Sequence, residues 1–290
     1  MAAEIRPLPA PDALSHPAFE PLRPWLGQLR GWPDLAALNM LAAAAPVPPV
    51  TASGLAVRFC IPETSAAGHY ETRIFETGRV DTRPGNLHDL FNALAWIAFP
   101  RTKAAINARH VARLPREGRV RGPLRDLLTL VDEGGVIVAC TEQTLPGFEA
   151  LIRGFRWQAL FWDGRNELLR DARFVLAGHS AYEKALSPYP GITCKALFIA
   201  TPRERLGGPF AGLVDWLDVA ASGWVASLPD DAAPRQMAPL PVFGYPGWLA
   251  DSNGAEFYAD RRWFRPGRTP AHAPGIAGKL ESLGAHPDSV

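Results

Sequence analysis

Proline is the residue that most limits what this chain can fold into. The 290 residues include 29 prolines, about twice the usual share of roughly 5%. Because proline fixes φ and lacks a backbone N–H donor, it ends helices and is excluded from central strands. The prolines are densest before residue 50 and after residue 229. We therefore expect two irregular arms, 1–50 and 229–290, packed on a regular core at 51–228 as parts of one domain.

The composition predicts a globular protein with a sizeable core. Hydrophobic side chains make up 47% of the chain, enough to bury a substantial interior. The most apolar stretch, 35–45, contains Asn39 and ends at a proline, so it falls short of the ~20 residues of a membrane span. The first residues carry an acid and an early proline in place of the basic flank and apolar run of an export signal. We expect no membrane association.

The cysteines indicate the compartment. Cys60, Cys140 and Cys194 are far apart, odd in number and set in apolar surroundings. They predict reduced thiols, because a disulfide framework or a zinc knuckle needs closely spaced pairs. We expect a cytoplasmic protein.

Strands and helices both have signals in the core. Strands are predicted from alternation or short apolar runs at 55–60, 70–75, 173–177 and 195–200. Two β-rich runs, 127–131 and 136–140, flank an acidic glycine turn and predict a hairpin. Helices are predicted at 35–45, 87–97, 102–113, 180–186 and 210–227 and within 144–170. Asn86 and Thr102 are placed to cap the second and third of these.

The order of these elements predicts the fold class. Strands and helices alternate only loosely, and the predicted hairpin is antiparallel. That pattern favours an α+β fold, with a mixed or antiparallel sheet and flanking helices, over a doubly wound parallel sheet.

The densest set of candidate functional side chains lies on two of the predicted helices. His88 and Asn92 are four residues apart and share a face of the first helix. Lys103, Asn107 and His110, spaced four and three apart, share a face of the next. If the proline between the helices folds them together, two imidazoles, two carboxamides and an ammonium meet in one cleft.

Such a cluster has a catalytic and a structural interpretation. These groups can hold and deprotonate an attacking water beside an anionic substrate. His88 and His110, with Asp89, would alternatively supply ligands for a divalent metal ion. The structural interpretation is that the side chains satisfy buried backbone groups. Leaving several of them unpaired would cost roughly 1 to 3 kcal/mol each.

A basic segment follows the cluster. From 101 to 125 the chain has eight basic residues and one acid, which gives +7 against a total of +1. The basic residues are Arg101, Lys103, Arg109, Arg113, Arg116, Arg119, Arg121 and Arg125. Local charge of this kind favours a phosphate or another polyanion, although a solvated basic face is the commoner outcome. We expect Arg101, Arg109 and Arg113 to bind the anionic group.

The same region resembles a known family. The segment HDLFNALAWIAFPRTKAAIN at 88–107, preceded by TRPGN at 82–86, is similar to the signature of a proteobacterial family, domain-of-unknown-function family 3025. The resemblance continues in LTLVDE-x-G at 128–135, GH-x-x-YEK at 178–184, GIT-x-KAL at 191–197 and PLPV-x-G-x-PGW at 239–248. It extends from about residue 55 to residue 266. It implies a single structural unit and carries no activity with it.

The resemblance adds residues that could meet the His88 cluster: Asp132, Glu133, His179 and Glu183. Asp132 and Glu133 fall at the tip of the predicted hairpin, where we expect them to be solvated. No chemical role is assigned to His69, or to His16, His272 and His286 in the proline-rich ends.

A serine nucleophile is a further alternative. Gly178-His-Ser-Ala-Tyr182 lies between a predicted strand and helix and is close to the G-x-S-x-G nucleophile elbow. Its last position is Tyr182, where the sharp turn needs a small residue. A plain turn from strand to helix is therefore the favoured interpretation of Ser180.

The leading hypothesis is a hydrolase that acts on a phosphate-bearing or other anionic small molecule. His88, Asn92, Lys103, Asn107, His110 and His179 would form its catalytic site, with or without a divalent metal ion. The rival is a non-catalytic nucleic-acid-binding or assembly protein that uses the basic segment 101–125. Acyl transfer through Ser180 is the second alternative. The sequence leaves the oligomeric state open.

Overall fold

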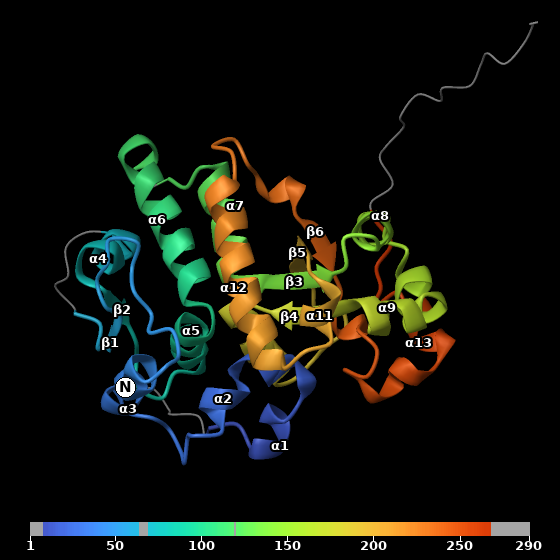
Figure 1. Cartoon of the computed structure of the whole chain (residues 1–290), viewed down its shortest axis with the longest axis horizontal. Coiled ribbons are helices and arrows are strands. Elements are labelled where there is room, and N and C mark those ends of the chain that lie inside the picture. The colour runs from blue at the N-terminus through green and yellow to red at the C-terminus, as the bar shows by residue number, and fades with distance from the viewer. Residues whose placement is uncertain (1–7, 64–68, 119, 268–290) are drawn as a thin grey trace, which may run out of the picture.

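A four-stranded sheet lies at the centre of the protein. In a computed structural model, which describes residues 8–63, 69–118 and 120–267, the strand order of this sheet is β4-β3-β5-β6 (Figure 1). β3 (Gly135–Cys140) runs antiparallel to β4 (Ala172–Leu176) and parallel to β5 (Cys194–Ala200), which runs antiparallel to β6 (Ala238–Leu240). All residues of β3 are buried. The mixed sheet with flanking helices confirms the predicted α+β class.

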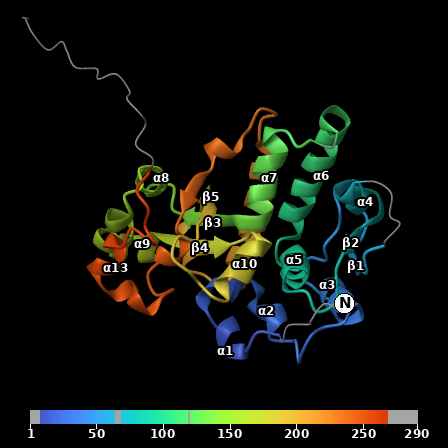
Figure 2. The same ribbon diagram turned by 180° about the vertical axis from the view of Figure 1, so that it is seen from behind.

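Helices stand in layers beside this sheet. α7 (Pro123–Gly134) and α12 (Phe210–Ser227) contact it directly, and α6 (Pro100–Glu117) packs against both of them. α5 (Leu87–Ala98) and α4 (Tyr70–Thr77) contact α6 on its other side. Next to α4 lie the short parallel strands β1 (Arg58–Cys60) and β2 (Arg79–Asp81). Seen from behind, α10 (His179–Ala185) lies alongside α7 (Figure 2).

None of the remaining α-helices is longer than nine residues in the described part of the chain. They are α1 (Pro11–Leu14), α2 (Arg23–Leu26), α3 (Leu35–Ala43), α8 (Leu145–Arg153), α9 (Arg165–Asp171), α11 (Arg203–Leu206) and α13 (Ala255–Ala259). A π-helical turn, Ala159–Asp163, precedes α9. The predicted helices at 35–45, 87–97 and 210–227 and within 144–170 are thus confirmed. Among the described residues, no helix has the length and apolarity to cross a membrane.

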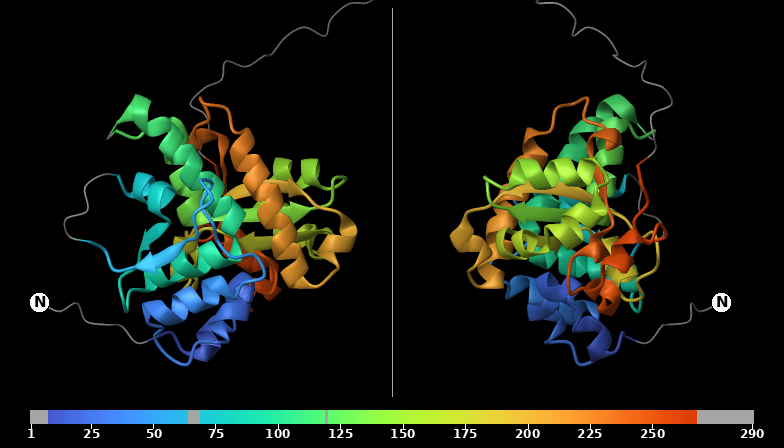
Figure 3. Two further views of the ribbon diagram at one scale, coloured as in Figure 1. Left: turned by 60° about the vertical axis from the view of Figure 1, so that its left-hand side comes forward. Right: turned by 90° about the vertical axis from the view of Figure 1, so that its right-hand side faces the viewer.

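Both proline-rich ends pack on the core as far as they are described (Figure 3). Phe19, in the 3-10 helix Pro17–Leu22, is fully buried, with its ring 5.9 Å from that of Phe91 and 5.8 Å from that of Tyr182. His16 meets Trp248, which brings the two ends of the chain together. The C-terminal segment also supplies the edge strand β6. His272 and His286 lie outside the described residues.

The strand predicted at 70–75 is wrong, because this segment forms α4. His69 Nδ1 accepts a hydrogen bond from the backbone N–H of Glu71 at 3.2 Å and caps the helix. Gly78, at φ 70°, ends it in the left-handed conformation that favours glycine. Six alternating residues fit a short helix as well as a strand, and the two caps decide between them.

The hairpin predicted at 127–140 is also wrong. Residues 127–131 belong to α7, and β3 begins directly after it. The buried hydrophobic residues of this helix are spaced three and four apart: Leu124, Leu127, Leu128 and Val131. Asp132 and Glu133 therefore lie in the last turn of a helix and not at a hairpin tip.

The start of α6 depends on a buried carboxylate of α12. Asp218 is 0% exposed and accepts hydrogen bonds from the backbone N–H groups of Arg101 and Thr102, at 3.0 and 2.8 Å. Thr102 does not cap the helix as predicted, because α6 begins at Pro100 and the Thr102 hydroxyl donates to the Asp218 carbonyl. α12 therefore satisfies the free donors of the helix that carries Lys103 and His110.

We expect Asp218→Ala to lower the free energy of unfolding by about 2 to 4 kcal/mol, because it removes a helix cap and leaves two buried donors unpaired. For a chain of this size that corresponds to a fall in Tm of roughly 4 to 16 °C. Asp215→Ala is the matched control, since Asp215 is also an α12 carboxylate that pairs with Arg101, at 2.8 Å, but is exposed. It should cost no more than about 1 kcal/mol. If urea unfolding showed the same loss of unfolding free energy in Asp218→Ala and Asp215→Ala, the capping role of Asp218 would be contradicted.

Candidate active site

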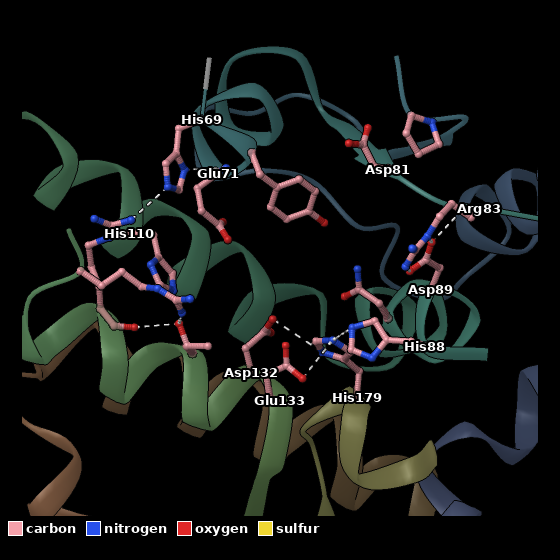
Figure 4. Close-up of a pocket in the computed structure, with 16 residues that line it drawn as sticks. His69, Glu71, Asp81, Arg83, His88, Asp89, His110, Asp132, Glu133 and His179 are labelled. Atoms are coloured by element: carbon pink, nitrogen blue, oxygen red, sulfur yellow. Dashed lines mark hydrogen bonds and ion pairs between the residues drawn. The ribbon is translucent and has the colours of Figure 1, made fainter. Parts of the chain in front are cut away.

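A cavity of about 600 Å³ opens between α4, α5, α6 and α7, and the start of α10 closes one side of it (Figure 4). Figure 4 shows His88 and His179 at one end of this cavity and His69 and His110 at the other. Of the five side chains predicted to share a cleft, those of His88, Asn92 and His110 line the cavity, and those of Lys103 and Asn107 do not. The Asn107 amide donates to the backbone carbonyl and the carboxylate of Glu71.

A close approach of two backbones forms the His179 end of the cavity. Gly178 lies against the end of α7, where a Cβ on it would be 2.4 Å from the backbone nitrogen of Gly135 and 2.6 Å from the carbonyl carbon of Glu133. Its N–H also donates to the carbonyl of Gly135 at 2.9 Å. Only glycine fits this contact. It places His179, the first residue of α10, beside Asp132 and Glu133.

His179 and His88 form a pair of imidazoles. Their Nε2 atoms are 3.1 Å apart, and their ring centroids are 4.6 Å apart at an angle of 71°. His179 is buried, whereas the His88 side chain is 36% exposed. Burial, with a contribution from the nearby Lys103, lowers the pKa of His179 to about 4. His179 is therefore neutral at pH 7, with one N–H donor and one free lone pair.

Three carboxylates surround the pair. The Nδ1 atom of His88 faces Glu183 Oε2 at 3.6 Å, and the Nδ1 atom of His179 faces Asp132 Oδ2 at 3.6 Å. Glu133 Oε2 lies 3.9 Å from His179 Nε2. The expectation that both acids are solvated is therefore wrong for Asp132, which also pairs with the buried Lys103, whereas the Glu133 side chain is 42% exposed. His88, Glu133 and His179 offer ligand atoms that all lie within 4.8 Å of one another.

Lys103 is buried behind this group. Its ammonium donates to Asp132 and, at 2.8 Å, to Asn92, and it lies 5.5 Å from the centre of the Trp96 ring. Burial would raise the pKa of the Asp132 carboxyl, but Lys103 and His179 outweigh burial, so this pKa lies below its ordinary value. Lys103 thus holds Asp132 as a carboxylate and does not itself line the cavity.

The other end of the cavity is basic. The Arg125 guanidinium is 1% exposed and lies 3.0 Å from His69 Nε2. Arg121 is exposed and donates to the Thr129 hydroxyl at 2.7 Å. Burial lowers the pKa of His110 to about 4, with Arg125 and Arg121 adding to the effect. His110 makes no side-chain hydrogen bond within the described part of the chain, and its Nδ1 is buried.

Asp89 and His110 do not join the group that could hold a metal ion. Asp89 accepts two hydrogen bonds from the guanidinium of Arg83, at 2.7 and 2.9 Å, and one from its backbone N–H. Burial favours the protonated acid, but Arg83 keeps the pKa of Asp89 below its ordinary value. Of the three metal ligands predicted from sequence, His88, Asp89 and His110, only His88 lies in the group with Glu133 and His179.

The predicted anion-binding arginines lie outside the cavity. Arg101 pairs with Asp215 and Asp218, and Arg109 binds the carbonyl of Leu228. Arg113 pairs with Glu117 at 2.9 Å and with Asp230 at 2.8 Å. These pairs neutralise one face of α6 against α12 and the segment that follows it. Arg119 lies outside the described residues.

Several lining residues were missed by the sequence analysis. They are His69, Tyr70, Glu71, Arg121, Arg125 and Thr129. Assigning 70–75 to a strand concealed the first three, and assigning 127–131 to a strand concealed the end of α7. The three- and four-residue spacing of buried leucines in α7 is the signal that could have corrected the second error. Ser180, by contrast, does not line the cavity, and no histidine hydrogen-bonds its hydroxyl among the residues described.

Comparison with known proteins identifies one related group. The family described as "Protein of unknown function (DUF3025)" matches residues 57–268. No curated protein and no solved structure matches the chain. The match includes every residue of the cavity described above.

His110 should make the fold sensitive to acid. Its pKa is about 4 in the folded protein against an ordinary value of 6.5, so as the pH falls the unfolded chain takes up a proton first. Stability is therefore lost between about pH 6.5 and pH 4. Glutamine does not titrate. Between pH 7.5 and pH 5, the free energy of unfolding of His110→Gln should therefore fall by about 1 to 2 kcal/mol less than that of the wild type. Equal losses in urea unfolding would show that His110 takes up its proton within the fold.

Proposed function

The chain belongs to the DUF3025 family, and we propose that it is a hydrolase acting on a small molecule that carries a phosphate or another anionic group. The observation that carries the proposal is the His88–His179 pair in the cavity wall, with a carboxylate facing the Nδ1 atom of each ring. Pairs of base and orienting carboxylate are the arrangement by which proteins activate a nucleophile.

The pair is the place at which an attacking water would be activated. His88 is exposed to the cavity, so water and substrate can reach it. Glu183 and Asp132 would orient the rings through Nδ1, and Lys103 with Asn92 would hold Asp132. Lys103, predicted to be catalytic, would then act as a positioning residue. Asn107, also predicted to be catalytic, binds Glu71 and has no hydrogen bond to either ring in the described part of the chain. Asn92 both lines the cavity and binds Lys103.

The basic end would bind the anionic group of the substrate. Arg125 already has Glu117 at 3.7 Å, whereas the Thr129 hydroxyl is the only side-chain partner of Arg121 in the described part of the protein. Arg121 therefore has no acidic partner among the described residues. Its guanidinium can bind a phosphate or a carboxylate of the substrate. His110 also lines this end of the cavity. A substrate would then extend from Arg121 toward the His88–His179 pair.

The two alternatives have less support. Arg101, Arg109 and Arg113 are engaged by acids or carbonyls of the same chain, so few charges of the basic segment remain for nucleic acid. The Ser180 hydroxyl has no hydrogen bond to a histidine in the described part of the chain and does not line the cavity. We propose neither nucleic-acid binding nor acyl transfer.

We also propose that the protein works in the cytoplasm. Its three cysteines are free thiols, and Cys140 and Cys194 are buried. Burial raises the pKa of both of these thiols to about 12. Unpaired, unreactive thiols are typical of a reducing compartment.

His88→Gln tests the role of the pair. Activity against a panel of p-nitrophenyl phosphates and anionic esters should fall at least ~10²-fold, the usual worth of a positioned acid or base. Because His88 is partly exposed and glutamine can still hydrogen-bond, we expect Tm to fall by less than ~8 °C. Ser180→Ala is the control and should keep full activity. The proposal would be contradicted if Ser180→Ala lost activity, or if His88→Gln kept the activity of the wild type.

Arg121→Gln tests the anion contact. Losing one guanidinium–anion contact should raise KM about tenfold, the equivalent of ~1.4 kcal/mol, with little change in kcat. Arg109→Gln removes the same charge from the outside of the cavity and should leave both constants unchanged. If Arg109→Gln had the larger effect on KM, the outer face of α6 and not the cavity would bind the substrate.

A further inference from the structure

We propose that His88, Glu133 and His179 bind one divalent transition-metal ion of the zinc type, with a coordination position open to the cavity. This inference rests on the proposed function, since the ion would be the group that activates the attacking water. Two imidazoles and one carboxylate, plus a water, form a common catalytic zinc site.

The ligand atoms converge on one point. His88 Nε2 and Glu133 Oε2 lie 3.1 and 3.9 Å from the same atom, His179 Nε2. Around an ion with bonds of about 2.0 to 2.1 Å, tetrahedral ligands are about 3.3 Å apart. The three side chains come from α5, α7 and α10. The two imidazoles already lie close to that spacing, and all three ligand atoms lie within 4.8 Å of one another. Few side-chain movements would be needed to enclose an ion.

The hydrogens of the two rings support a cation at this point. A neutral imidazole has one N–H and one lone pair. The Nδ1 atom of each ring faces a carboxylate at 3.6 Å, and the Nδ1 atom of His179 is buried without a hydrogen-bond partner in the described part of the chain. When the N–H of each ring is on Nδ1, toward Glu183 and Asp132, the two Nε2 lone pairs lie 3.1 Å apart. A metal ion would accept both lone pairs.

The carboxylates behind the rings are those that a metal site needs. Histidines that bind a metal ion usually donate their other N–H to a carboxylate or carbonyl, which fixes the ring and strengthens the ligand. Glu183 occupies that position for His88, and Asp132 occupies it for His179. Lys103 and Asn92 in turn hold Asp132 through a hydrogen-bonded chain. Each ring therefore has a carboxylate beside its Nδ1 atom, which leaves both Nε2 atoms for the ion.

The charges of the group also match a dication. Asp132, Glu133 and Glu183 supply three negative charges, and Lys103 supplies one positive charge, which leaves −2. Among the described residues, neither Glu133 nor Glu183 has a lysine or arginine partner. A divalent ion would balance the group.

The test is metal binding by the full-length protein, stripped with a chelator and titrated with Zn²⁺ by calorimetry and with Co²⁺ by visible absorption. We expect one ion per chain and a tetrahedral Co²⁺ spectrum. His88→Gln and Glu133→Gln should weaken binding at least ~100-fold, and Glu183→Gln about tenfold. The matched controls are Asp89→Asn and His110→Gln, which alter the ligands predicted from sequence alone. Both should bind the ion within about threefold of the wild type.

The outcomes separate this inference from the proposed function. No stoichiometric Zn²⁺ binding, or loss of binding in Asp89→Asn or His110→Gln but not in Glu133→Gln, would overturn the metal site. Hydrolysis that persists unchanged in the chelated protein would also overturn it and would leave the hydrolase proposal standing. If the ion binds as expected and no anionic substrate is hydrolysed, the metal site stands and the hydrolase proposal falls.

Discussion

The contact of Gly178 with the end of α7 is the constraint on which the rest of the site depends. β3 and β4 pair in antiparallel register, and the chain leaves β4 against the backbone of Glu133 to Gly135. Because no Cβ separates the two segments, the last turn of α7 and the first residue of α10 share one small volume. His179 enters the cavity there, beside two acids that are distant from it in sequence.

The buried polar groups are linked as a chain. Asn92 and Asp132 hold Lys103, Asp132 faces His179, and His179 contacts His88, which faces Glu183. Removing Asp132 would leave the buried Lys103 ammonium without its carboxylate, which is more costly than the net stabilisation of an intact pair. Such a chain is a costly way to stabilise a core but an effective way to hold ring orientations. Its position in a cavity wall therefore supports a chemical role.

Most of the arginines of the basic segment 101–125 form ion pairs or hydrogen bonds within the chain. On one face of α6, arginines pair with acids of α12 and of the segment after it. The positive field that the sequence concentrates at 101–125 is thereby largely neutralised within the chain. Arg121 and Arg125, which lie beyond the end of α6, are the members of the segment that line the cavity.

The sequence by itself determined the α+β class, most of the long helices, the family and the presence of His88, Asn92 and His110 in one cavity. Those features follow from local periodicity and from the three- and four-residue spacing of helix faces. It did not determine α4 or α7, because a few alternating or β-rich residues fit either a helix or a strand until caps and neighbours decide. Only the tertiary structure brought His179 and Glu133 to His88 and took Asp89 and Arg101 to other partners. Distances between residues remote in sequence depend on backbone contacts such as that of Gly178, which no local pattern encodes.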